Sequence, residues 1–145
     1  MSSSEVRLEN QLCFPLYACA KEVVRKYKPY LDPLDLTYTQ YIALMVLWGE
    51  GKVSMKDMGK RLYLDSGTLT PLLKKLEEKG YVTRLRDKED NRNVYISLTE
   101  EGKKLEAKAS DIQRDIGSCM PLGADDMIDL YRILNTLLAS FADGR

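Results

Sequence analysis

The feature that most constrains this chain is the order of secondary-structure signals in its middle third. A short helical pattern headed by a serine covers residues 54–62, and a second helical pattern covers residues 66–79. Serine is a favoured N-cap, and Gly80 stands where a C-cap glycine is expected. Two segments rich in β-branched and aromatic residues follow, at 81–86 and 93–98. The predicted order is therefore helix, tight turn, helix, strand, strand.

The polar segment 87–92 joins the two predicted strands as a hairpin that is longer than the tightest turns. Two short helices followed by such a hairpin make a winged helix-turn-helix. In modules of this kind the second helix enters the major groove of DNA. The sequence therefore predicts that residues 54–98 bind double-stranded DNA, in a fold that is mainly α with a small β-wing.

The second helix of this module predicts the contacts. Its first turn carries small polar side chains, at a helix end whose free N–H groups and dipole favour anions. The wing adds cations, of which Arg92 is placed to reach a narrow minor groove. Singly, each of these residues could equally cap a helix or be solvated, and it is the ordered set that favours DNA. The predicted DNA contacts are Asp65, Ser66, Thr68, Thr70, Lys74, Lys75, Arg84, Arg86, Lys88, Asp90 and Arg92.

The distribution of charge supports a local rather than a global attraction to nucleic acid. The whole chain has zero formal net charge. Residues 60–99 carry nine positive and six negative side chains, whereas residues 100–145 carry six positive and nine negative ones. The basic excess thus coincides with the predicted module, where phosphates would be contacted.

Further helices are predicted before the module. One begins near Cys13, with Pro15 tolerated in its first turn, and is expected to stop at Pro29. A capping box from Thr37 to Gln40 opens the next helix, which is apolar almost all round and should be buried.

Two more helices are predicted after the module. Thr99 caps a long helix that ends near Cys119, and residues 124–142 form a last helix with an apolar stripe. A chain of 145 residues offers these helices little other core. We therefore expect one domain over residues 1–145 that forms a homodimer through residues 1–36 and 100–145; packing within one chain is the alternative.

Composition excludes several classes of protein. The chain has no histidine and no Cys-x-x-Cys pair, so the usual zinc sites and the usual general base of hydrolases are missing, and we expect neither metal nor cofactor. The apolar run at 42–48 is too short to span a membrane. The first residues do not resemble a secretory signal, so a cytoplasmic location is expected.

Specific motifs resemble the MarR family of winged-helix regulators. They are the stretch 66–80, then Arg84, the Asp90–Arg92 pair at the wing tip, and the segment 97–102. The resemblance covers nearly the whole chain. It implies a homodimer on a palindromic DNA operator, with the terminal helices as the dimerisation region. Because a DNA-binding module would have no purpose in an enzyme, we expect no enzymatic activity.

A second set of residues resembles the organic-hydroperoxide-sensing (OhrR-type) repressors of that family. The set comprises residues 8–18, 27–29, Tyr38 and 62–66. In those regulators an organic hydroperoxide oxidises an N-terminal cysteine and DNA is released, and the matching residue here is Cys13. The resemblance implies that the hydroxyls of Tyr17, Tyr27 and Tyr38 are hydrogen-bond partners of the cysteine, the last two from the other subunit.

The resemblance also suggests a role for Cys119. Some members of the subfamily resolve the oxidised cysteine as an intersubunit disulfide with a second cysteine in this region, and others use a small thiol. The position of Cys119 favours the first class. Cys19 lies about 240° round the helix from Cys13 and is expected to serve packing only.

The residues around Cys13 themselves favour this chemistry. In the first turn of a helix, free N–H groups stabilise a thiolate, which attacks peroxides and becomes sulfenic acid. Tyr17, four residues later, shares a helix face with it, and Phe14 and Leu16 make the surroundings apolar. A buried structural cysteine is the alternative reading.

Two other functions remain open at the level of sequence. The chain could be a MarR-type regulator that binds a small aromatic ligand, in a pocket lined by some of its nine tyrosines and Trp48. It could also be a thiol peroxidase, although a DNA-binding module would then have no purpose.

Overall fold

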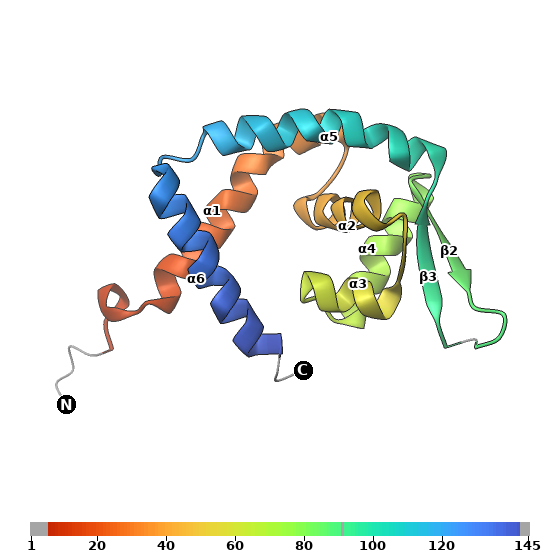
Figure 1. Ribbon diagram of the computed structural model, residues 1–145, viewed down its shortest axis with the longest axis horizontal. Coiled ribbons are helices and arrows are strands. Elements are labelled where there is room, and N and C mark those ends of the chain that lie inside the picture. The colour runs from red at the N-terminus through yellow and green to blue at the C-terminus, as the bar shows by residue number, and fades with distance from the viewer. Residues whose placement is uncertain (1–5, 91, 143–145) are drawn as a thin grey trace. The chain divides into compact units, whose positions relative to one another are not determined.

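The computed structural model describes residues 6–90 and 92–142. It has two compact units, one ending at Tyr38 and the other beginning at Thr39, and each is described by itself. The class that the sequence predicts, mainly α with a small β-wing, is confirmed. The elements in chain order (Figure 1) are η2 (Leu8–Asn10), α1 (Cys13–Leu31), η3 (Asp32–Leu34), α2 (Tyr38–Glu50), β1 (Lys52–Ser54), α3 (Met55–Leu62), α4 (Ser66–Glu78), β2 (Val82–Arg86), β3 (Val94–Leu98), α5 (Glu100–Ser118) and α6 (Ala124–Ala142).

The first unit is built around α1, which begins at Cys13 as predicted but does not stop at Pro29. The helix continues to Leu31, with Pro29 inside its last turn. A proline removes one backbone hydrogen bond. The next turn still closes, because the N–H of Asp32 donates to the carbonyl of Lys28. The expectation that Pro29 ends the helix is therefore wrong by two residues.

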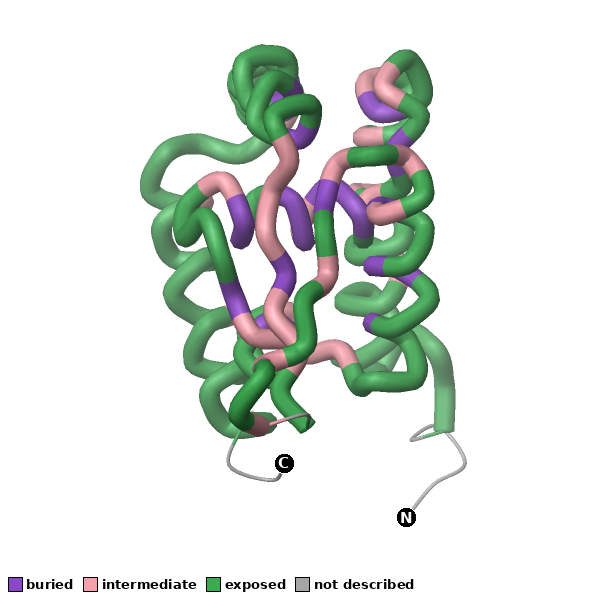
Figure 2. Tube along the Cα trace, turned by 90° about the vertical axis from the view of Figure 1, so that its right-hand side faces the viewer, coloured by how far each residue is buried: buried purple, intermediate pink, exposed green. Residues whose placement is uncertain are grey.

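In the second unit α2 is the central helix, as its apolar composition predicts. It continues through Gly49 and ends at Glu50, before Gly51 with a φ of 79°. Figure 2 colours the buried positions of the chain purple. Those on α2 are Gln40, Tyr41, Ala43, Leu44, Val46 and Leu47.

Side-chain caps begin α3 and α4, the two helices that follow. The hydroxyl of Ser54 accepts from the N–H of Asp57 at 3.1 Å, so α3 is capped as predicted. The Asp65 carboxylate accepts from the N–H of Thr68 at 2.8 Å and caps α4. Each cap satisfies one of the free donors in a first helical turn.

The turn between α3 and α4 is tight. Tyr63 adopts the left-handed conformation with a φ of 56°, which is uncommon for a residue other than glycine. The N–H of Leu64 then donates to the carbonyl of Gly59 at 3.0 Å. A side chain at Gly59 would lie 2.9 Å from the Leu64 carbonyl, so a glycine permits this close approach.

The wing is a three-stranded antiparallel sheet with the order β1-β3-β2. Strands β2 and β3 lie within a residue of their predicted bounds, and Arg84 pairs with Ile96 at their centre. Strand β1 was not predicted from the sequence, because three residues are too few to show an alternation of apolar and polar side chains. Its last residue, Ser54, both ends the strand and caps α3.

Helix α4 buries one face and exposes the other, as predicted. Its end is also as predicted: Gly80 has a φ of 83°, and its N–H donates to the carbonyl of Glu77. The N–H of Tyr81 donates to the carbonyl of Leu76, which completes a Schellman motif and turns the chain into β2. The buried face consists of Leu69, Leu72, Leu73 and Leu76.

The start of α5 is bonded to two other parts of the second unit, the corner after α4 and the end of α2. Thr99 caps the helix through the N–H of Gly102, and its own hydroxyl donates to the carbonyl of Gly80 at 2.6 Å. The N–H of Thr99 donates to the carbonyl of Tyr81. The indole of Trp48 donates to the carbonyl of Gly102 at 2.9 Å. We call these five residues the α5 junction.

The two C-terminal helices differ in burial. Helix α5 buries an apolar stripe that includes Leu105, Ile112 and Ile116, whereas α6 has no buried residue in the structure. Ile128 and Tyr131 on α6 are 64% and 73% exposed. Among the residues that the structure describes, no helix is both long and apolar enough to cross a membrane.

The α5 junction predicts a large effect of a single methyl group. A Cβ at position 102 would collide with the Tyr81 carbonyl, so Gly102→Ala should lower the free energy of unfolding by about 1–3 kcal/mol. Gly117→Ala, in the same helix with open space around it, should instead raise it by about 0.5–1 kcal/mol. Urea unfolding of both variants measures this, and equal stabilities would contradict the close packing at Gly102.

Candidate nucleic-acid interface and cysteine site

Helix α4 presents the predicted contact residues on its solvent side. The hydroxyl residues lie in its first two turns, and the two lysines follow on the same exposed surface. Asp65 precedes them, but its carboxylate is engaged in capping the helix. The structure therefore brings these residues together on one helix: Ser66, Thr68, Thr70, Lys74 and Lys75.

The wing tip is organised by Asp90 and Arg92. The backbone N–H and the Nε of Arg92 each donate to Oδ1 of Asp90 at 3.1 Å. The hydrogen bond from the Arg92 side chain lowers the pKa of the Asp90 carboxyl, so the pair stays charged at neutral pH. The Arg92 side chain remains 90% exposed. Because Asp90 fixes the backbone and the Nε of Arg92 while most of the side chain is in solvent, the guanidinium can reach into a DNA groove.

Two of the remaining wing cations, Arg86 and Lys88, are exposed, and the third is not. Arg84 lies on the face of β2 that points toward α4, where its Nε and Nη2 donate to Oε1 of Glu77 at 3.2 and 3.0 Å. The charge of Arg84 is thus compensated by Glu77, although Arg84 lines one cleft with Thr70 and Arg86.

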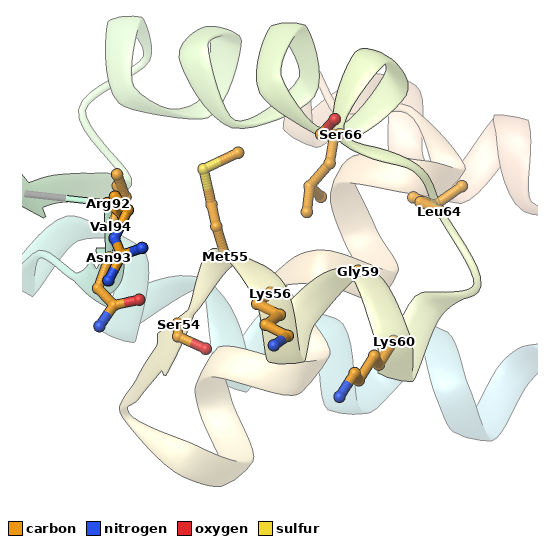
Figure 3. Close-up of a pocket in the computed structure, with 11 residues that line it drawn as sticks. Ser54, Met55, Lys56, Gly59, Lys60, Leu64, Ser66, Arg92, Asn93 and Val94 are labelled. Atoms are coloured by element: carbon orange, nitrogen blue, oxygen red, sulfur yellow. The ribbon is translucent and has the colours of Figure 1, made fainter. Parts of the chain in front are cut away.

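A cavity of about 460 Å³ opens between α3, α4 and the end of the wing. Figure 3 shows Lys56 and Lys60 from α3, Ser66 from α4 and Arg92 from the wing around it. Sequence reasoning missed the two lysines because it searched only the second helix and the hairpin. Their spacing of four residues on a short capped helix is the signal that could have found them.

Cys13 is the first residue of α1 and is exposed in the chain. Leu12 precedes it as a cap whose side chain makes no hydrogen bond, and the first turn has no acidic residue. Cys13 therefore lies at the positive end of the helix dipole, with no carboxylate in the same turn to oppose an anionic sulfur. Pro15 has no N–H, and the N–H of Leu16 donates to the carbonyl of Leu12 at 3.5 Å. The alternative of a buried structural cysteine does not hold for the single chain.

Tyr17 lies one turn after Cys13 on the same face of α1 and is 63% exposed. The ammonium of Lys21, a further turn along, lies 5.9 Å from the centre of its ring. Three residues with a spacing of four thus form a continuous exposed row that begins at the thiol.

Tyr27 and Tyr38 form a pair within the first unit. Their ring centres lie 4.9 Å apart with the planes tilted by 55°. Burial raises the pKa of both phenols, and the neighbouring Tyr38 raises that of Tyr27 further. Both hydroxyls therefore stay protonated and remain potential hydrogen-bond donors to an anion.

One chain cannot bring this tyrosine pair to its own Cys13. Cys13 and Tyr27 lie on the same helix and are fourteen residues apart, or about 21 Å along its axis. A tyrosine side chain is far shorter than that distance. A site that contains Cys13 and Tyr27 therefore needs the Tyr27 of a second chain.

The other two cysteines are also exposed. Cys119 follows the last turn of α5, and its N–H donates to the carbonyl of Ile116 at 3.1 Å. Cys19 lies on α1 and is exposed, so the expected packing role is not met in the single chain.

The fold and the exposed polar helix together define a class of protein. A helix-turn-helix with a capped second helix, a basic surface and a three-stranded wing is the architecture of a winged-helix DNA-binding regulator.

Comparison with known proteins identifies the family. The model of the SarA/Rot transcriptional regulators matches residues 25–109. The organic hydroperoxide resistance transcriptional regulator of Bacillus subtilis is 50% identical over 133 residues, which are 92% of this chain and 90% of that protein. The regulator SarZ of Staphylococcus aureus is 52% identical over 94% of this chain and 93% of its own length.

Solved structures agree with the sequences. AbfR of Staphylococcus epidermidis, in its reduced form bound to DNA, matches with a TM-score of 0.78 and 34% identity over 97% of this chain and 99% of that one. This chain therefore belongs to the MarR-type winged-helix transcriptional regulators that include SarA/Rot and SarZ. The predicted resemblance is confirmed, and so is the prediction of a regulator rather than an enzyme.

The two lysines of α3 predict a change in salt dependence. Each phosphate contact contributes about 0.9 to the slope of log affinity against log salt concentration. If Lys60 contacts a phosphate, Lys60→Gln should weaken DNA binding and reduce the slope by about that amount. Lys104→Gln, at an exposed position of α5, is the control and should leave the slope unchanged. Fluorescence anisotropy across a salt series measures both, and equal slopes would remove Lys60 from the interface.

Proposed function

We propose that this protein is a transcriptional repressor that senses organic hydroperoxides through Cys13 and then releases its DNA operator. The observation that carries the proposal is the position of Cys13, which is exposed at the positive end of the α1 dipole and has no acidic residue in that turn. The similarity to a regulator of organic hydroperoxide resistance supports it. So does the similarity to AbfR, which has been solved reduced and overoxidised on DNA and with a disulfide formed.

The proposed reaction at Cys13 is a two-electron oxidation. The thiolate sulfur attacks one oxygen of the hydroperoxide, the O–O bond breaks, and the second oxygen leaves with its carbon chain and takes up a proton. The peroxide is reduced to an alcohol, and the sulfur is oxidised to sulfenic acid. Phe14 and Leu16, which follow Cys13 at the start of α1, have partly exposed apolar side chains, which suit an organic peroxide.

The site is proposed to be completed by a second copy of the chain. Apolar residues lie exposed along α6 and at the start of α1, and faces of this kind mark interaction surfaces. The separation of Cys13 from Tyr27 along one helix also favours two chains. In the homodimer, Tyr17 of one subunit and Tyr27 and Tyr38 of the other would donate hydrogen bonds to the sulfur.

DNA binding is proposed to use the exposed face of α4 in the major groove and the wing tip in the adjacent minor groove. A twofold dimer places two such helices about one DNA turn apart, which requires a palindromic operator. Oxidation within the dimer would shift that spacing and release DNA. The proposed contacts are Ser66, Thr68, Thr70, Lys74, Lys75, Arg86, Lys88 and Arg92, with Asp65 and Asp90 as the residues that hold them.

Substituting the sensor tests the proposal directly. An organic hydroperoxide should release the parent protein from its operator, whereas Cys13→Ser should stay bound because no sulfenic acid can form there. Cys19→Ser is the matched control on the same helix and should respond like the parent. A gel-shift assay in reduced and oxidised buffer reads the result. Equal release of Cys13→Ser would rule out Cys13 as the sensor.

The fate of the oxidised sulfur is proposed to depend on Cys119. A thiol at this exposed position would attack the sulfenic sulfur of the partner subunit, which forms a disulfide and releases water. Non-reducing gels of the oxidised protein should then show a band at twice the 16.6 kDa of the chain, and Cys119→Ser should abolish it. A mixed disulfide with a small thiol, seen by mass spectrometry in place of that band, would contradict the proposal.

One observation favours a small aromatic ligand as a second candidate effector. A cavity of about 320 Å³ between α2 and α5 is lined by Tyr41, Met45 and Trp48. However, the Tyr41 hydroxyl already donates to Gln113 at 3.1 Å, and the indole N–H donates to Gly102. DNA release of Cys13→Ser by an aromatic compound without oxidant would favour this ligand over the peroxide.

A further inference from the structure

The bond between Glu77 and Arg84 joins the recognition helix to the wing. Two nitrogens of the Arg84 guanidinium donate to one carboxylate oxygen of Glu77, at 3.2 and 3.0 Å. Both side chains are largely shielded, with 29% of Arg84 and 36% of Glu77 exposed. The ion pair at the wing tip differs, because its two residues are separated by only one position and Arg92 is almost wholly in solvent.

Glu77 binds both sides of the corner between α4 and β2. Its backbone carbonyl accepts from the N–H of Gly80 at 3.0 Å, where the chain turns with a positive φ. Its carboxylate accepts from Arg84, four residues beyond that turn and at the centre of β2. A single residue in the last turn of α4 thus closes the corner through its main chain and its side chain.

The Glu77–Arg84 ion pair lies beside the surface that is proposed to bind DNA. Glu77, Arg84, Thr70 and Arg86 line one cleft of about 360 Å³ between α4 and the sheet. Thr70 is seven residues before Glu77 on the same helix face, and Arg86 is two residues after Arg84 on the same strand face. Arg84 therefore lies close to a DNA-binding surface without having to touch DNA.

Electrostatics argue against Arg84 as a phosphate ligand. Its charge is compensated by Glu77, and a phosphate that took Arg84 away would lie next to the carboxylate left behind. Like charges at such short range repel. The hydrogen bond from Arg84 also lowers the pKa of Glu77, so the carboxylate is ionised at the pH at which regulators bind DNA.

We propose that Glu77 and Arg84 are positioning residues that fix the angle between the recognition helix and the wing, so that α4 and the wing tip engage adjacent grooves together. Arg84 is thereby reassigned from a DNA contact to a positioning residue. We call the Glu77–Arg84 pair a strut, meaning an ion pair that holds α4 and the wing at a fixed angle. The inference concerns DNA reading by the winged module and is independent of the thiol chemistry proposed above.

The sign of one substitution distinguishes a strut from a phosphate contact. If the pair is a strut, Glu77→Gln should lower operator affinity, about threefold to tenfold, although it removes a negative charge beside DNA. Arg84→Gln should lower it by a similar factor, and the double variant should lose little more than either single one. If Arg84 instead binds a phosphate in competition with Glu77, Glu77→Gln should raise the affinity.

Salt dependence gives a second, independent readout. As a strut, Arg84→Gln should keep the parent slope of log affinity against log salt concentration, whereas loss of a phosphate contact should reduce the slope by about 0.9. Binding to DNA without an operator should change little in either variant, so the specificity ratio should fall. Glu78→Gln removes the same charge from the neighbouring exposed position and is the control for charge alone.

The experiment uses the reduced full-length protein and fluorescence anisotropy at a temperature well below the measured melting points. The exchanged variant Glu77→Arg with Arg84→Glu should recover part of the operator affinity that Arg84→Glu alone loses. Failure of that recovery would overturn the proposal. So would an operator affinity of Glu77→Gln that equals or exceeds that of Glu78→Gln.

Discussion

The second unit depends most on the hydrogen bonds at the start of α5. The Trp48 indole donates to the carbonyl of Gly102, and the Thr99 hydroxyl both caps the helix and donates to the carbonyl of Gly80. Through them the first turn of α5 is bonded to Trp48 at the end of α2 and to the corner that follows α4. Neither the recognition helix nor the wing can shift far without straining these bonds. The same turn begins α5, which ends next to Cys119. One continuous helix therefore connects the DNA-binding module to the proposed resolving cysteine.

Much of this fold could be predicted from local chemistry. Ser54, Thr99 and Gly80 occupy their expected capping positions because caps depend on a few neighbouring residues and leave a clear mark in sequence. Strand β1 could not be predicted, since three residues carry no period and their pairing with β3 depends on contacts far along the chain. The predicted end of α1 at Pro29 was wrong because the helix has only two residues after the proline, and a proline so near the end of a helix costs little stability.

The candidate sites were predictable in composition but not in role. The identity of Cys13 as a first-turn cysteine follows from the spacing of the apolar residues after it. That Arg84 bonds Glu77 does not follow, because an arginine on a basic hairpin looks the same whether it faces DNA or a helix. Lys56 and Lys60 were missed because their part in the surface appears only when α3, α4 and the wing are assembled around one cavity.

The chain contains a single tryptophan, and its indole nitrogen is bonded to the first turn of α5. Indole emission responds to hydrogen bonding and to solvent, so the protein carries its own optical reporter at the place where α2, α5 and the α4 corner meet. Any rearrangement that reaches this point can be followed in unlabelled protein, in real time and without DNA. A response at Cys13 that never alters this emission must reach DNA by another path.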